Sequence, residues 1–278
     1  MRSFVTGIVC LLFSCVPAAA DDWLKALMLF DAGRYEEALE LAAPFAEADN
    51  LLAQEMLYAS YTYGYGVPVD HVKALAWLQR SADLGDVEAQ MAMGMHFFDG
   101  VGVAPDYSEA MRWFRLAAQQ GHGGAVFNLG KMTMNGQGVE ADPQEAWRLV
   151  QFAAELDDPG ALHMVGATLL QNFAETGEIN VAVDYLERAA LLGHGQAGAL
   201  MGFILEDLPE NPDNLIKSAF YYRTAIVAGC DDLADEAAKA VARLSPSEIK
   251  MLEHNLALWR PDTDPRDPQP ELGHCLAG

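Results

Sequence analysis

The apolar positions of this chain recur at three- and four-residue steps in one segment after another, which is the helical period. Residues 89–97 follow this spacing, and residues 108–119 again place their apolar side chains on one helical face. Gly100 lies between the two segments, and glycine adopts left-handed backbone angles without steric cost. The pattern therefore predicts a helix, a loop that begins at this glycine, and a second helix.

Capping residues support the same division. Asp106 stands where the second helix should begin, with Glu109 three residues later, which is the spacing of a capping box. Asp142 repeats the arrangement, with Pro143 at the first helical position. We therefore expect aspartate caps at the second helix of each unit.

This helix–loop–helix unit returns every 36 residues. The residues that recur at this spacing are loop glycines, capping aspartates and small residues inside the helices. They are Gly64, Gly100 and Gly136; Asp70, Asp106 and Asp142; and Ala74, Ala110, Ala146 and Ala182. A single helical hairpin cannot bury its apolar face alone, so repetition at this period predicts stacked hairpins that cover one another.

The residues at these positions form the pattern A-x3-LG-x2-Y-x2-G-x-GV-x2-D-x2-(K/E)A-x2-W-x4-A-x2-G, which resembles the Sel1-like repeat, a relative of the tetratricopeptide repeat. The resemblance implies an all-α, right-handed α-solenoid. Residues 52–158 match the pattern well, and residues 159–229 have drifted from it. Five repeats are expected, at residues 51–86, 87–122, 123–158, 159–194 and 195–229.

The flanks extend the same architecture. Residues 21–50 resemble an ordinary tetratricopeptide hairpin, and residues 230–260 predict a final helix pair that caps the stack. Residues 261–278 contain four prolines, which predict an extended tail because proline lacks the backbone donor that a helix needs.

The first 20 residues have the features of a secretory signal peptide. Arg2 precedes a short apolar run, and Ala18-Ala19-Ala20 forms a small-residue cleavage site before Asp21. A lipoprotein reading stays open, since residues 12–15 faintly resemble a lipobox that ends at Cys15. We expect export to the periplasm or beyond, and no later stretch is apolar enough to predict a membrane span.

Charge and cysteine content narrow the class of partner. The formal charge is −23, which repels nucleic acid and anionic lipid and favours a protein partner with a basic surface. Most of the acidic side chains are expected to lie on solvated helix faces. After removal of residues 1–20 only Cys230 and Cys275 remain, and one pair in an oxidising compartment predicts one disulfide.

No catalytic or metal-binding constellation emerges from the sequence, and no cofactor is expected. Ser247 and Lys250 have the S-x-x-K spacing of penicillin-interacting enzymes, but Ser245-Pro246-Ser247-Glu248 is better explained as a helix start, and no S-D-N or K-T-G follows. Residues 86, 122, 158, 194 and 230 read Asp, His, Asp, His and Cys. They stand one repeat apart, too far from one another for shared zinc ligation, so we interpret them as helix caps.

The resemblance places the partner on the inner, concave face, because the first helix of each hairpin lines that face in tetratricopeptide-like stacks. Its variable positions on this chain are rich in Met and Phe, which suit adaptable capture of a peptide or helix. The predicted partner-binding residues are Glu55, Tyr63, Glu88, Met91, Met95, Phe98, Phe127, Met134, His163 and Phe203.

The sequence thus favours a non-enzymatic, exported repeat scaffold that acts as an adaptor or regulator in the bacterial envelope. Two alternatives stay open. One is a β-lactam or peptidoglycan hydrolase like the cysteine-rich branch of the family, although this chain lacks a cysteine pair in each repeat. The other is a secreted factor that binds a host protein. The oligomeric state is not indicated by the sequence.

Overall fold

The computed structural model describes residues 18–172, 179–208 and 212–259, and all regular structure in those residues is helical. The chain divides into two compact units, residues 1–120 and 121–278. None of the described helices combines the length and the apolarity needed to cross a membrane. Most of the predicted signal peptide (1–20) lies outside the described residues. The whole predicted tail (261–278), including Cys275, also lies outside them.

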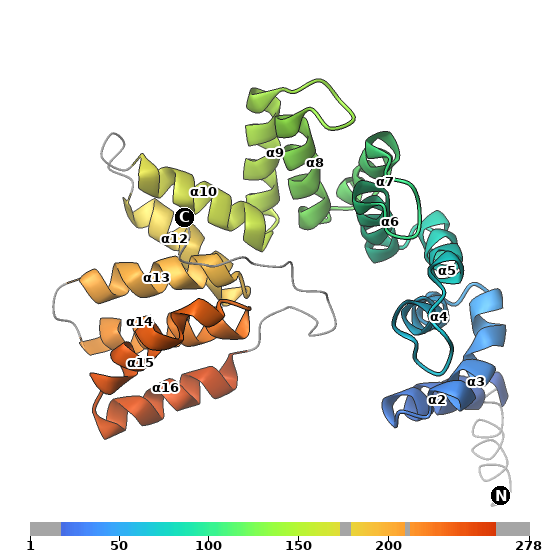
Figure 1. The fold of residues 1–278 in the computed structure, drawn as a ribbon, viewed down its shortest axis with the longest axis horizontal. Helices are drawn as coiled ribbons and strands as arrows, with labels where there is room; N and C mark the ends of the chain where they lie inside the picture. The colour runs from blue at the N-terminus through green and yellow to red at the C-terminus, as the bar shows by residue number, and fades with distance from the viewer. Residues whose placement is uncertain (1–17, 173–178, 209–211, 260–278) are drawn as a thin grey trace, which may run out of the picture. The chain divides into compact units, whose positions relative to one another are not determined.

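The first unit consists of three helical hairpins (Figure 1). Each hairpin pairs two consecutive helices: α2 (Ala18–Asp31) with α3 (Tyr35–Glu47), α4 (Leu51–Tyr63) with α5 (His71–Asp83), and α6 (Val87–Asp99) with α7 (Tyr107–Gln119). Successive hairpins also contact each other, since α3 packs on α4 and α5 packs on α6. The unit is therefore a short stack, as the repeat pattern predicts.

The second unit continues the series with three more hairpins. They pair α8 (Gly123–Asn135) with α9 (Pro143–Glu155), α10 (Pro159–Gln171) with α12 (Ile179–Leu191), and α13 (Gly195–Asp207) with α14 (Pro212–Val227). A 3₁₀ turn η1 (Asp231–Leu233) and helices α15 (Ala234–Ala242) and α16 (Pro246–Leu258) follow, and all three pack on α14. The segment where a final helix pair was expected thus contains two helices, each packed on α14 (Figure 1).

Side-chain caps at the start of the helices follow the period. Asp86, His122, Asp158 and His194 each accept a hydrogen bond from the amide three residues later, so the capping interpretation of these positions is confirmed. Cys230 differs, because it precedes η1 and makes no side-chain cap hydrogen bond. The capping interpretation of the fifth position is wrong.

The second helices α5, α7 and α9 are capped in the same way, by Asp70, Asp106 and Asp142, but with one difference from the prediction. Asp106 accepts from the amide of Glu109 at 3.1 Å, yet the Glu109 carboxylate pairs with Arg112 at 2.8 Å. The reciprocal half of the box is replaced by an ion pair. A complete capping box forms between Ser245 and Glu248 at the start of α16, which confirms the structural interpretation of that motif.

Loop glycines end the first helices as expected. Gly64, Gly100 and Gly136 have φ of 81°, 73° and 67°, in the left-handed region. The second helices of several hairpins also end at left-handed residues, and two of these are not glycine: Asp49 has φ of 64° and Asp157 has φ of 59°. A non-glycine residue in this region carries a small strain.

An arginine 31 residues later pairs with each of these aspartates. Arg80 Nε lies 2.8 Å from Asp49 Oδ1, and Arg188 Nη2 lies 2.5 Å from Asp157 Oδ1. In both cases the arginine is on the second helix of the next hairpin, and Arg80 also pairs with Glu47 at 2.7 Å. We call these contacts the aspartate–arginine joints. They connect one hairpin to the next.

Buried glutamines make a second repeated connection in the first unit. Gln54 donates to the carbonyl of Ala46 at 3.0 Å, and Gln90, 36 residues later, donates to the carbonyl of Ala82 at 3.1 Å. Each amide thus adds a second donor to a carbonyl at the end of the preceding helix, which also accepts a hydrogen bond from the backbone amide three residues later.

Glycines inside the first helices let the two helices of a hairpin approach closely. A Cβ placed on Gly94 would lie 2.4 Å from Phe114 Cε1, and one on Gly202 would lie 2.5 Å from Tyr222 Cε1. Phe114 and Tyr222 are both fully buried. In these two hairpins the ring of the second helix therefore occupies the space that the glycine leaves on the first helix, which allows close packing of the two helices.

Candidate interaction surface

The ten predicted partner-binding residues all lie on the first helices of hairpins, and none belongs to the buried core. We call the side of the stack formed by α4 and α6 in the first unit, and by α8, α10 and α13 in the second, the first-helix surface of that unit. The first unit carries Glu55, Tyr63, Glu88, Met91, Met95 and Phe98, and the second carries Phe127, Met134, His163 and Phe203.

In the first unit this surface carries apolar side chains that are partly exposed to solvent. Tyr63 is 48% exposed and Met95 is 36% exposed, whereas Met91 and Phe98 are half-buried. The ring of Phe98 contacts Tyr107 of the paired helix, with centroids 5.5 Å apart. Phe98 therefore contributes to its own hairpin and also presents part of its ring to solvent.

A hydrogen bond connects α4 and α6, the two helices that form this surface. The hydroxyl of Tyr58 on α4 lies 3.0 Å from Nε2 of His96 on α6, and Nδ1 of His96 lies 2.8 Å from the carbonyl of Val101. The His96 imidazole thus connects α4 of the neighbouring hairpin to the loop that follows α6. This contact fixes the spacing of α4 and α6, and with it the spacing of the side chains beside them.

The charge on this surface is of one sign. Helices α4 and α6 contain Glu55, Glu88 and Asp99 and no lysine or arginine. On the second helices of the unit, Arg80 and Arg112 are paired with acids. The surface formed by α4 and α6 therefore carries acids without a lysine or arginine on the same helices.

In the second unit the predicted residues also connect adjacent hairpins. A Cβ on Gly160 of α10 would lie 2.7 Å from Phe127 Cε1, so the Phe127 ring occupies the space that this glycine leaves. Lys131 Nζ lies 4.9 Å from the centre of the same ring. Met134 and Phe203 are 39% and 36% exposed. The surface here is apolar with one cation.

Two histidines meet on this surface, although the sequence suggested no pairing for them. The rings of His163 on α10 and His194, the cap of α13, are stacked with centroids 4.4 Å apart and an interplanar angle of 20°. Burial, and to a lesser degree the charge of His163, lowers the pKa of His194 to about 3. Burial also lowers the pKa of His163, so both rings are neutral at pH 7.

The signal that could have found this pair is its spacing. His163 and His194 are 31 residues apart, the same separation as in both aspartate–arginine joints. Residues 36 positions apart occupy equivalent places in neighbouring hairpins. The residues in these contacts are 31 positions apart, which is five fewer than the period. The repeat alone does not reveal that difference.

A third titratable group of the second unit, Asp158, is half-buried. Burial raises the pKa of Asp158, the cap of α10, while its hydrogen bond from the Ala161 amide and the charge of Lys131 oppose that shift. Across residues 18–172, 179–208 and 212–259, no three His, Cys, Asp or Glu side chains are grouped closely enough to hold a metal ion.

Comparison with known proteins gives a family and a fold. The sequence profile described as Sel1 repeat matches residues 46–86, 87–122, 124–158 and 162–194. The fifth predicted repeat, at residues 195–229, lies outside these matches, although α13 and α14 form a hairpin there. Comparison with curated protein sequences gives no match.

Solved structures of repeat proteins resemble the whole stack. A Sel1 repeat protein from Oxalobacter formigenes is 26% identical, with a TM-score of 0.65, and the alignment covers 84% of this chain and 98% of that one. A protective antigen of uropathogenic Escherichia coli with the same kind of fold is 22% identical, with a TM-score of 0.60 over 86% of this chain and 53% of its own, so this chain spans about half of its length. With four repeats matched over more than half of its residues, this chain belongs to the Sel1 repeat family, whose members are generally scaffolds for protein–protein interaction.

Proposed function

We propose that this protein is an exported scaffold that binds a protein or peptide on its first-helix surfaces and acts as an adaptor or regulator in the bacterial envelope. One observation carries the proposal: all ten predicted residues lie on the first helices and outside the core. Side chains that were needed only for packing would be buried, whereas these leave Met, Phe and Tyr atoms in contact with solvent.

The chemistry of the partner follows from the surface of the first unit. Methionine and aromatic side chains adapt to an apolar helix or extended segment. The acids Glu55, Glu88 and Asp99 favour basic residues beside that segment, and such charges act mainly on association rate and specificity. The proposed partner segment is therefore amphipathic, with an apolar face and basic flanks.

The binding proposal predicts that Phe127→Ala weakens partner binding. If the ring is an anchor, its loss should reduce affinity by at least about 30-fold, the equivalent of 2 kcal/mol. The partner is first captured by crosslinking to the protein in an envelope extract, and its affinity is then measured by calorimetry. Phe152→Ala is the matched control, because Phe152 is 48% exposed on the second helix α9.

The thermal midpoint of each variant is measured together with its affinity. Phe127 is half-buried against α10, so a moderate loss of stability is expected as well. A variant that melts early but binds the partner with unchanged affinity would assign Phe127 to packing and would contradict the proposal.

Export predicts a particular mass for the protein recovered from the envelope. Helix α2 begins at Ala18, so cleavage after Ala20 leaves Asp21 in its first turn, where a carboxylate is favourable. The exported chain should begin at Asp21 and should be about 2 Da lighter than the reduced chain, through a disulfide between Cys230 and Cys275. Intact-mass measurement before and after reduction checks both features. Lipid on Cys15, or two free thiols, would contradict them.

A further inference from the structure

The helix at the start of the stack leaves an apolar stripe uncovered. Ala26 and Leu29 of α2 are buried against α3, but Leu24 is 58% exposed and Met28 is 65% exposed. These two residues are one helical turn apart and therefore point in the same direction. Asp21 and Asp31 are exposed at the two ends of the same helix, near the two ends of this stripe.

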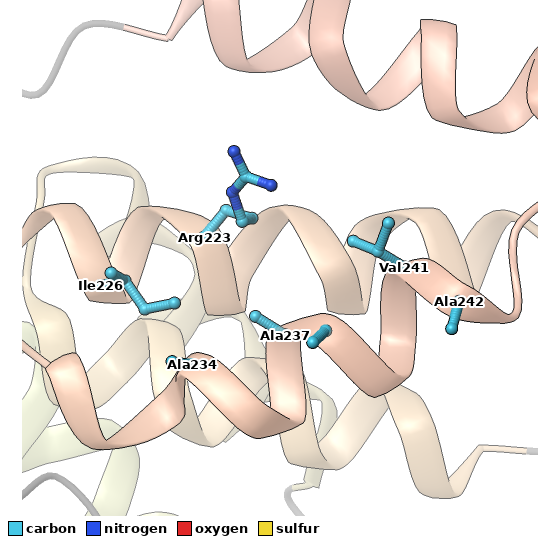
Figure 2. Close-up of a pocket in the computed structure, with 7 residues that line it drawn as sticks. Arg223, Ile226, Ala234, Ala237, Val241 and Ala242 are labelled. Carbon is cyan, nitrogen blue, oxygen red and sulfur yellow. The ribbon is translucent and has the colours of Figure 1, made fainter.

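The last helices contain an apolar groove. Arg223 and Ile226 of α14 line one side of it, and Val241 together with the alanines of α15 lines the other, around a volume of about 480 Å³ (Figure 2). Ala234, Ala238 and Ala242 are exposed, and alanine side chains allow a helix to approach closely. The groove thus has the small walls and the apolar floor that larger aliphatic side chains can fill.

Arg223 gives the groove a positive charge. Its guanidinium stands above the groove (Figure 2), and it takes part in no ion pair with any residue between 18 and 259 that the structure describes. By contrast Arg243 pairs with Glu206 at 2.8 Å, and Lys239 pairs with Glu236 at 3.4 Å. A ligand of this groove would therefore present an apolar stripe with an acid beside it.

We propose that α2 of a second copy of this chain occupies the groove between α14 and α15. Leu24 and Met28 would fill the alanine-lined space, and an acid at one end of the stripe, Asp21 or Asp31, would face Arg223. The two surfaces are different, so the contact is heterologous and joins copies head to tail. This association is independent of partner binding on the first-helix surfaces.

Sedimentation of the chain exported from cells, at concentrations up to about 1 mM, tests the proposal. The wild-type protein should associate as its concentration rises. Met28→Glu on α2 and Ala238→Glu in the groove should each weaken association at least tenfold, because each places a carboxylate in the apolar contact. Val72→Glu is the control, since Val72 is 74% exposed on α5 and lies outside both surfaces.

Mixing the two variants distinguishes this contact from other modes of association. Each variant retains one intact surface, so a mixture of Met28→Glu and Ala238→Glu proteins should form a 1:1 heterodimer with wild-type affinity, while neither variant associates alone. A wild-type protein that stays monomeric at every concentration would overturn the proposal. A mixture of the two variants that does not associate, which is the result expected for a symmetric contact, would also overturn it. So would a protein that associates only after residues 260–278 are deleted.

Discussion

Gly94→Leu should lower the free energy of unfolding of this protein by about 3 kcal/mol, near the upper end of what overpacking costs. A Cβ at this position would lie 2.4 Å from a carbon of the Phe114 ring, and that ring is fully buried and cannot move aside. Chemical denaturation followed by circular dichroism measures the loss. The propensity of leucine for helices acts in the opposite direction but is worth less than about 1 kcal/mol.

A second variant shows whether the clash is the cause. Phe114→Ala alone should cost about 3–5 kcal/mol, because it leaves a cavity in the core. In the double variant Gly94→Leu, Phe114→Ala, the new leucine can enter that cavity, so the combined loss should be clearly smaller than the sum of the two. Additive losses would show that Gly94 matters for a reason other than its contact with Phe114.

Acid should destabilise the second unit through His194. The pKa of this imidazole is lowered to about 3 in the folded protein, against about 6.5 in an unfolded chain, so the unfolded state binds the proton more readily between these values. Stability is therefore unaffected by this group above about pH 6.5 and falls as the pH decreases toward 3. At pH 5 the expected loss is about 2 kcal/mol.

His194→Asn should remove this part of the pH dependence. Asparagine can accept the same hydrogen bond from the Ala197 amide, and it carries no titratable group. The thermal midpoint is measured between about pH 7 and pH 4.5 for the wild-type protein, the variant and His254→Asn, a control at an exposed histidine of α16. If the variant loses stability in acid as steeply as the wild-type protein, His194 is not the group responsible.

The sequence predicted the repeated architecture because its recurring residues act locally. Asp106 and Asp142 act on amides two and three residues away, and Gly100 determines the backbone at its own position. Such features depend on the nearest turn of chain and can be found without knowing the tertiary structure. The helix pairs and most caps followed from them.

Contacts between hairpins could not be predicted in the same way. The stacking of His163 on His194 depends on how far the first helix of one hairpin lies from the start of the first helix of the next, and the period does not contain that distance. For the same reason the sequence could not show that Phe98 and Phe127 are half-buried. Each ring lies between a neighbouring helix and solvent, at a depth that the helical period does not give.

The aspartate–arginine joints make the stack sensitive to its ionic surroundings. Most hairpins end at a left-handed glycine such as Gly85, whose geometry is independent of salt, whereas Asp49 and Asp157 reach the same backbone shape with an exposed ion pair beside them. Dissolved ions weaken exposed ion pairs, and the Debye length shortens from about 10 Å at 0.1 M salt to about 3 Å at 1 M. Hairpin connections three repeats apart would therefore loosen together as the ionic strength of the surrounding medium rises, while the glycine connections stay unchanged.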